Sequence, residues 1–226
     1  MRDRGADAVR AINGTATRAD AQPGGATSSM TRRLVVTQRL RQLVSLASLT
    51  FAAAFGMSAT WIPVKAAVAQ ILLHQAWERA RAGSSTARPW PWADTWPVGR
   101  LLAPRYGIDQ IVLAGASGNS LAFAPAHVDG TALPGRCGNC VLSGHRDTHF
   151  RFLERLQPGD ALELEAPDGR RQRFAVRSTD VQDRSDVAVL DDSDAPMLTL
   201  ITCYPFDAVV PGGPLRFVVR AESVAE

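Results

Sequence analysis

Three side chains in the C-terminal half of the sequence have the types and settings needed for acyl transfer. Cys203 ends an apolar segment, Leu198-Thr-Leu-Ile-Thr-Cys203, and a proline follows two residues later. A cysteine nucleophile needs a base nearby, because an unassisted thiol is only slightly ionised at neutral pH and the departing amine must be protonated. Cys203 is therefore a candidate nucleophile, with an inert core thiol as the alternative interpretation.

His145 and Arg216 are the candidates for the other two functions. His145 follows an apolar run and a glycine, whereas His149 falls in a short candidate helix at residues 147–156. Arg216 lies in an apolar strand pattern that would hold its stem, and its guanidinium could stabilise a developing oxyanion. The alternatives are a hydrogen-bonded structural histidine and an arginine on the outer face of a barrel. Asp147 could orient His145, although we expect it at the surface.

Two further cysteines, Cys137 and Cys140, form a Cys-x-x-Cys pair upstream of His145. If they pair in an oxidising compartment, Cys203 is the leftover thiol. A local disulfide and two separate buried thiols are both compatible with the sequence. Two ligands alone do not define a metal site, and we predict none here.

Short strands must position these residues. Apolar runs bounded by turn residues predict strands at residues 110–114, 120–124, 139–144, 161–165, 171–178, 197–202 and 215–220. Asp168-Gly169 predicts a two-residue hairpin turn between the fourth and fifth of these strands. About seven strands with one short helical candidate favour a small β-barrel or sandwich over an alternating α/β fold.

The charge distribution separates an N-terminal segment from the rest of the chain. The 226 residues carry a net formal charge of +3. Eight arginines and three aspartates give the first 41 residues a net +5, whereas 17 basic and 19 acidic residues give the remainder −2. The surplus positive charge therefore belongs to the N-terminal segment, so we expect no nucleic-acid partner for the main domain.

Composition divides the chain into four segments. For residues 1–31, the composition predicts a disordered basic tail in the cytoplasm. Residues 32–64 predict a membrane anchor, because positions 42–64 are uncharged and four arginines precede them. A cleavable signal peptide and a buried helix are the alternatives. For residues 65–97, we predict an amphipathic helix followed by an extended Trp/Pro-rich arm. The residues at helical spacing are Val68, Ile71, Leu72, Gln75 and Ala76. We predict that residues 98–226 form the barrel.

Three segments resemble the motifs of the sortases, membrane-anchored cysteine transpeptidases, in order and approximate spacing. They are Gly144-His145-Arg146, Leu198-Thr-Leu-Ile-Thr-Cys203-Tyr-Pro205 and Leu215-Arg-Phe-Val-Val219. The resemblance covers about residues 90–221 and implies a closed barrel of about seven to eight strands after an N-terminal transmembrane helix. Residues 90–101, 113–117 and 130–135 look in particular like the Gram-negative subgroup, class GN.

The resemblance implies a reaction and a location. Cys203 would attack a Leu-Pro-x-Thr-Gly-like C-terminal sorting signal on a partner protein, His145 would transfer protons, and Arg216 would hold the oxyanion. An amine acceptor would then resolve the thioacyl-enzyme without any metal or organic cofactor. The protein would cross the inner (cytoplasmic) membrane once, with its catalytic domain in the periplasm.

Other contacts and functions stay open at the level of sequence. Trp92, Asp94, Thr202 and Tyr204 are candidates for substrate or lid contacts, with Trp92 and Asp94 on the extended arm. A hydrolytic cysteine peptidase of the same fold would differ only in using water to resolve the thioacyl-enzyme. A non-catalytic membrane-tethered β-domain that binds a partner would instead keep Cys203 in its core.

Overall fold

The computed structural model describes residues 26–84, 86–210 and 212–224, with the backbone alone for residues 26–37, 40 and 53–63. The chain divides into two units, Met1–Ala59 and Thr60–Glu226. Helix α1 (Ala26–Arg81) begins in the first unit and ends in the second. Residues 26–31, which we expected to be disordered, are therefore helical, because extending an existing helix costs much less than starting one. The rest of the predicted tail lies outside the described residues.

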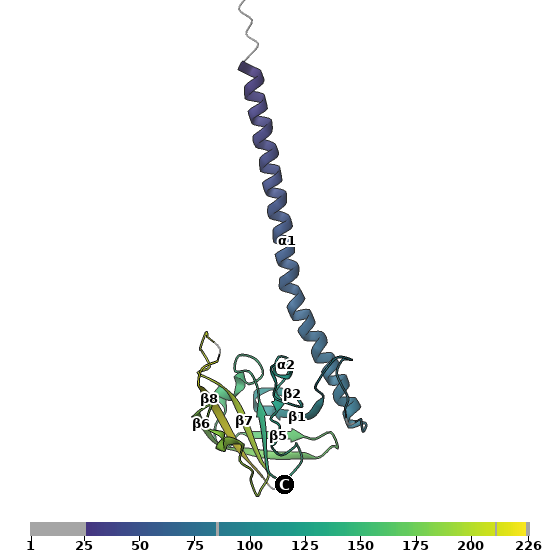
Figure 1. Ribbon diagram of the computed structural model, residues 1–226, viewed down its shortest axis with the longest axis vertical. Coiled ribbons are helices and arrows are strands. Elements are labelled where there is room, and N and C mark those ends of the chain that lie inside the picture. The colour runs from purple at the N-terminus through teal and green to yellow at the C-terminus, as the bar shows by residue number, and fades with distance from the viewer. Residues whose placement is uncertain (1–25, 85, 211, 225–226) are drawn as a thin grey trace, which may run out of the picture. The chain divides into compact units, whose positions relative to one another are not determined.

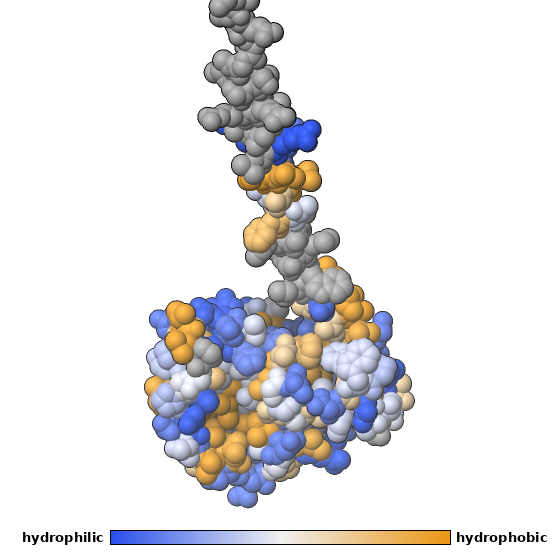
Figure 2. Space-filling view, turned by 45° about the horizontal axis from the view of Figure 1, so that its top comes forward, coloured by the Kyte–Doolittle hydropathy of each residue, from blue (hydrophilic) through white to orange (hydrophobic). Residues whose placement is uncertain are grey.

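The predicted membrane anchor falls within α1. Its described side chains include the exposed Leu43, Leu46, Leu49 and Phe51, and Figure 2 shows hydrophobic side chains along this part of the helix. Within the part of the chain that the structure describes, no helix combines the length and the hydropathy needed to cross a membrane. About half of the predicted anchor consists of positions whose side chains lie outside the described residues.

The second unit contains a closed barrel of eight strands (Figure 1). The strands are β1 (Pro97–Ala103), β2 (Ile108–Leu113), β3 (Ala126–His127), β4 (Asn139–Ser143), β5 (Ala161–Glu165), β6 (Arg171–Asp183), β7 (Met197–Tyr204) and β8 (Leu215–Ser223). They close in the order β1-β2-β3-β4-β7-β8-β6-β5. The β2–β3 and β4–β7 pairs are parallel and the others antiparallel. The predicted class, a mostly β closed barrel, is confirmed.

Short helices connect the strands. They are η1 (Pro104–Tyr106), α2 (Gly118–Leu121), η2 (Arg151–Arg155) and η3 (Val187–Leu190). The helix expected at residues 147–156 is a turn followed by the 3-10 helix η2, whose Phe152 and Leu153 are buried. The strand expected at residues 120–124 is wrong. The end of α2 and a turn occupy these positions, because Leu121 and Phe123 pack beside the buried Leu73 and Ala124 instead of joining the sheet.

Strand β1 begins at the last residue of the predicted helix and arm, residues 65–97. Pro97 is its first residue, a strand position that tolerates proline, which has no N–H to donate to the ladder. Buried and half-buried residues alternate strictly along β1, and the buried Leu101 and Ala103 belong to the barrel core. The predicted β5 strand and its hairpin with β6 are confirmed, and β6 runs five residues beyond its predicted end. The loop covers residues 167–169 and is one residue longer than predicted, since Ala166 N donates to Arg170 O and Gly169 N donates to Ala166 O.

The last part of α1, within the second unit, is amphipathic as expected, but its buried face is shifted and shares only Ala76 with the predicted one. Leu73, Ala76 and Trp77 are at most 1% exposed, whereas Val68 and Ile71 are about half exposed at 49% and 58%. Leu73 packs in a cluster with Leu113 and Ala126 of the barrel. The large Trp77 and Leu73 side chains determine which face of the helix packs on the barrel, because burying them removes more apolar surface from water than burying small side chains would.

Candidate active site

Cys203 and Arg216 lie directly opposite each other on adjacent strands. Cys203 is on β7, and the antiparallel register of β7 with β8 pairs it with Arg216. Opposite residues of an antiparallel pair point to the same face, with their Cβ atoms about 4.5–5.5 Å apart. Both side chains are half-buried. The thiol and the guanidinium therefore start from neighbouring positions on one face of the sheet.

The strand on the other side of β7 delivers His145. Strand β4 runs parallel to β7 up to the pair Ser143 and Ile201. Two hydrogen bonds extend this contact, since Gly144 N donates to Ile201 O at 3.2 Å and Thr202 Oγ1 donates to Gly144 O at 2.7 Å. His145 is the next residue and is exposed. The fold thus brings together the three predicted catalytic residues, which come from three neighbouring strands.

The alternation of the strands places this site on the outer face of the barrel. Leu200 and Val219 are fully buried members of the core cluster. Cys203 and Arg216 have the opposite parity to these residues, and successive side chains of a strand point to opposite faces. Cys203 is therefore directed away from the core, which disfavours the interpretation of this residue as an inert core thiol.

Thr202 and Tyr204 do not lie on the face of Cys203, contrary to our expectation. Thr202 is 2% exposed and its hydroxyl is used by Gly144 O. The Tyr204 ring stacks on Phe217 at a centroid separation of 6.3 Å and packs against the core cluster. Both side chains are directed inward because they are one residue away from Cys203 on the same strand.

Arg216 is held by backbone carbonyl groups just before it in the chain. Its Nη1 donates to Gly213 O at 2.8 Å and to Leu215 O at 2.9 Å. Among the described residues, its Nε and Nη2 have no hydrogen-bond partner. These two nitrogens of the fixed guanidinium fork remain for an oxygen atom of a bound substrate.

A groove of about 150 Å³ adjoins Arg216 on the outer face. Its apolar lining includes Val189, Leu190, Ile201 and Val218, and its polar lining includes Gln182, Asp183 and Arg184. Asn139 fixes the η3 wall of this groove by donating to Val189 O at 3.1 Å and Asp191 O at 3.0 Å. The groove can accept a short apolar segment of an extended chain beside the candidate catalytic residues.

The segment after His145 contains two further titratable side chains. Asp147 is exposed, as expected, and no hydrogen bond ties it to His145 among the described residues. His149 is half-buried, and burial lowers its pKa, with a further decrease from its electrostatic interaction with His145. Asp147 opposes this shift. His149 is therefore mainly neutral near pH 7, whereas His145 faces solvent.

Cys137 and Cys140 are free thiols in the structure, so no disulfide joins them. Cys137 is exposed, with its Sγ 3.3 Å from Asp194 O, whereas Cys140 is 3% exposed within the core cluster. Burial raises the pKa of Cys140 to about 12, which keeps this thiol protonated and unreactive. The two side chains separate because Cys140 is directed inward from β4 while Cys137 precedes the strand.

Trp92 and Asp94 lie at a different pocket. Trp92 is 82% exposed, and Asp94 accepts a hydrogen bond from Asn119 Nδ2 at 3.4 Å. Both line a pocket with Val68 and Phe123, and this lining includes none of the three predicted catalytic residues. The structure therefore does not place the arm as a lid over Cys203. The arm is not extended as we expected, because Ala93 N donates to Trp90 O at 3.0 Å and closes a turn, and the ring of Trp90 packs edge-on against Phe123.

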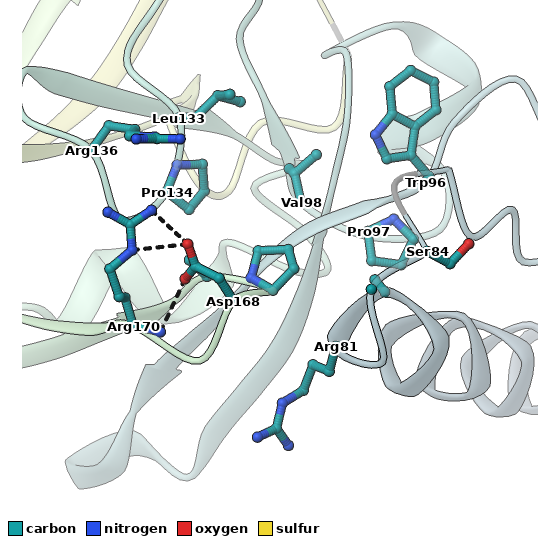
Figure 3. A pocket seen from close by; sticks show the side chains of 14 residues that line it. Arg81, Ser84, Trp96, Pro97, Val98, Leu133, Pro134, Arg136, Asp168 and Arg170 are labelled. Carbon is teal, nitrogen blue, oxygen red and sulfur yellow. Dashed lines mark hydrogen bonds and ion pairs between the residues drawn. The ribbon is translucent and has the colours of Figure 1, made fainter.

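A second pocket, of about 350 Å³, lies between the end of α1 and the β5–β6 turn (Figure 3). Arg170 pairs there with Asp168, and Arg81 and Arg136 lie at its edges. The lining contains no cysteine or histidine. This pocket therefore has the charge to attract an anion, but its lining includes none of the three predicted catalytic residues.

Sequence reasoning missed one residue beside the site. Arg146 is only 8% exposed and donates to carbonyl groups of the loop between β7 and β8. Its burial could not be read from the sequence, because an arginine next to an exposed histidine in a turn is ordinarily solvated.

Comparison with known proteins supports one family. The model of the sortase domain family matches residues 101–224, more than half of the chain. Sortase D of Bacillus subtilis is 30% identical over 127 residues, which are 56% of this chain and 63% of that protein. This chain therefore spans less than two thirds of the relative's length.

Solved structures agree with this match. The sortase D5 transpeptidase of Clostridium perfringens aligns with a TM-score of 0.51 and 25% identity over 57% of this chain and 79% of that one. Sortase C-1 of Actinomyces oris aligns with a TM-score of 0.51 and 26% identity over 57% of this chain and 74% of that one. The family model and the barrel that carries Cys203, His145 and Arg216 lead to the same conclusion: this chain belongs to the sortase family.

Proposed function

We propose that this protein is a cysteine transpeptidase that cleaves a C-terminal sorting signal on a partner protein and transfers the acyl group to an amine. The observation that carries this proposal is the pairing of Cys203 with Arg216 across β7 and β8, beside His145 at the end of β4. A nucleophile, a proton carrier and an oxyanion donor on one outer face are the parts that acyl transfer requires.

The residues supply each step of the reaction. Cys203 Sγ attacks the scissile carbonyl carbon, and Nε and Nη2 of Arg216 stabilise the oxyanion. When the carbon–nitrogen bond breaks, His145 donates a proton to the leaving amine, and a thioester remains on Cys203. The incoming amine then attacks this thioester, His145 accepts its proton, and the Cys203 thiolate leaves. No cofactor takes part in these steps.

The substrate class follows from the family and from the groove. A Leu-Pro-x-Thr-Gly-like signal presents an extended segment with apolar residues before its scissile bond. The groove beside Arg216 offers apolar contacts from Val189, Ile201 and Val218. These features support a protein substrate with such a signal, and an amine group on a second molecule as acceptor.

The test uses the full chain in detergent with a Leu-Pro-x-Thr-Gly peptide, with and without added amine, and product masses as the readout. Transpeptidation predicts an amide product that depends on the amine and disappears in Cys203→Ala. Free acid as the sole product would establish the hydrolytic peptidase instead. A wild-type protein that leaves the peptide intact would favour the non-catalytic binding module, although the outward direction of Cys203 argues against that function.

We also propose that residues 32–64 anchor the protein in the inner membrane, with the N-terminus in the cytoplasm and the barrel outside it. The support is the uncharged run at residues 42–64 after four arginines. Protease added to spheroplasts should digest the barrel, and a protected barrel would contradict this topology. Assignment to the Gram-negative subgroup rests on residues 90–101, 113–117 and 130–135 and is part of the same proposal.

A further inference from the structure

The loop between β7 and β8, described at residues 205–210 and 212–214, connects two of the three catalytic positions. It leaves β7 after Cys203 and enters β8 before Arg216. The carbonyl groups of Gly213 and Leu215 bind the Arg216 guanidinium. Gly213 belongs to this loop and Leu215 is the first residue of β8, so the end of the loop supplies one of the two contacts that direct Arg216.

The side chain next to His145 holds this loop. Arg146 Nη2 donates to Ala208 O at 2.7 Å and to Val210 O at 3.2 Å. A second arginine, Arg151, donates from Nη1 to Phe206 O at 2.9 Å, but it is exposed and also pairs with Glu154. Arg146 is thus the buried contact between the His145 segment and the middle of the loop.

The burial of Arg146 is not explained by stability. Its side chain is 8% exposed and forms no ion pair with a carboxylate among the described residues, and its buried Nη1 has no hydrogen-bond partner there. A buried charge without a counter-ion is commonly less favourable for folding than an apolar side chain of similar size. The guanidinium instead fixes the position of the loop relative to His145.

We infer that Arg146 is a positioning residue of the transpeptidation reaction. It fixes the β7–β8 loop against the His145 segment and so holds Arg216 in the direction needed for the oxyanion. Arg146 acts through the loop and does not touch the substrate. This inference rests on the proposed function for its kinetic consequence, but the hold on the loop can be measured independently.

The variants separate positioning from folding. Arg146→Met replaces the guanidinium with an apolar chain of similar length, and Arg146→Lys keeps a charge that can still donate to a loop carbonyl. Val176→Ala is the control, because it removes volume from the barrel core at a buried position of β6. It lowers the melting temperature without altering the loop contacts.

Kinetic measurements on the full chain in detergent use the Leu-Pro-x-Thr-Gly peptide and an added amine. Arg146→Met should lower kcat by about 10- to 100-fold, since small misplacements of catalytic groups cost this much, while KM stays within about twofold because no substrate contact is lost. Arg146→Lys should restore most of kcat. A kcat for Arg146→Met that is no lower than that of Val176→Ala would overturn the inference.

Limited digestion with elastase measures the loop without reference to turnover. Cleavage after Ala208 or Val209 should be several-fold faster in Arg146→Met than in the wild type and unchanged in Val176→Ala, well below the melting temperature. Equal cleavage in all three proteins would show that Arg146 does not hold the loop. If the wild type gives no amide product, the proposed function fails, and the elastase comparison still decides whether Arg146 positions the loop.

Discussion

Arg216 should be needed as a guanidinium, because the proposed function adds a second task to the contacts that the structure shows. Nη1 is bound to Gly213 O and Leu215 O, and Nε and Nη2 remain for the substrate. A lysine at this position has one compact ammonium group and cannot serve both sides. We therefore predict that Arg216→Lys, although it keeps the charge, loses most of the activity, and that Arg216→Met loses more.

The magnitude follows from the bonds involved. Removing one donor to a developing oxyanion costs about 10²–10³ in kcat, or about 2.7–4 kcal/mol. KM should change little, because the oxyanion exists only in the transition state and the intermediates near it. The two carbonyl contacts of Nη1 are partly exposed, so we expect the free energy of unfolding to fall by less than about 2 kcal/mol.

Arg220 provides a matched control for Arg216. It lies on the same strand and the same face, four residues further along, and pairs with Asp180 at 3.4 Å. Amide formation from the peptide and an amine gives kcat, and urea unfolding gives the stability. If Arg216→Lys keeps more than about a third of the wild-type kcat, or if Arg220→Lys loses as much as Arg216→Lys, the oxyanion function of Arg216 is refuted.

Three further predictions concern the surroundings of the site. Gly144→Ala should lower the free energy of unfolding by about 1–3 kcal/mol, because the Cβ of the new alanine would lie 2.8 Å from Cγ of the fully buried Phe150. Urea titration measures this, and an unchanged midpoint would contradict the packing. Burial raises the pKa of Asp160, but hydrogen bonds from Tyr106, Gln157 N and Arg105 outweigh it and lower the pKa below its ordinary value. Wild-type stability should therefore fall as the pH decreases below about 4, and Asp160→Asn should make this decrease less steep in thermal unfolding, because other carboxylates with lowered pKa values, such as Asp109, remain. An equally steep decrease in the variant would argue against this. Iodoacetamide should modify Cys137 and Cys203 in the native protein but leave Cys140 unmodified, because burial raises its pKa to about 12; early labelling of Cys140 in peptide maps would be the contrary result.

Strand periodicity predicted much of the barrel because it reflects local chemistry. The β5 strand and its turn at Asp168-Gly169 were predicted from alternating side chains and a turn dipeptide, both of which act within a few residues. The inward direction of Thr202 and Tyr204 was also available in the same pattern, since an outward Cys203 requires inward neighbours on both sides. Our expectation of substrate contacts there gave too little weight to parity.

Features set by distant contacts could not be predicted in the same way. The strand expected at residues 120–124 is lost to packing of Leu121 and Phe123 beside α1. The buried face of α1 is selected by the barrel surface against Leu73 and Trp77. Arg146 reaches carbonyl groups more than 60 residues away in the sequence, and no local pattern shows that contact.

The reactive pairing of Cys203 with its neighbours is tested most directly by trapping the acyl-enzyme. The full chain is incubated with a Leu-Pro-x-Thr-Gly peptide without amine, quenched in acid and digested, and the masses of the cysteine-containing fragments are measured. We predict a thioester on the fragment that contains Cys203, its loss when an amine is added, and the simultaneous appearance of the amide. An adduct on another residue, or amide formation that continues in Cys203→Ala, would contradict the proposed mechanism.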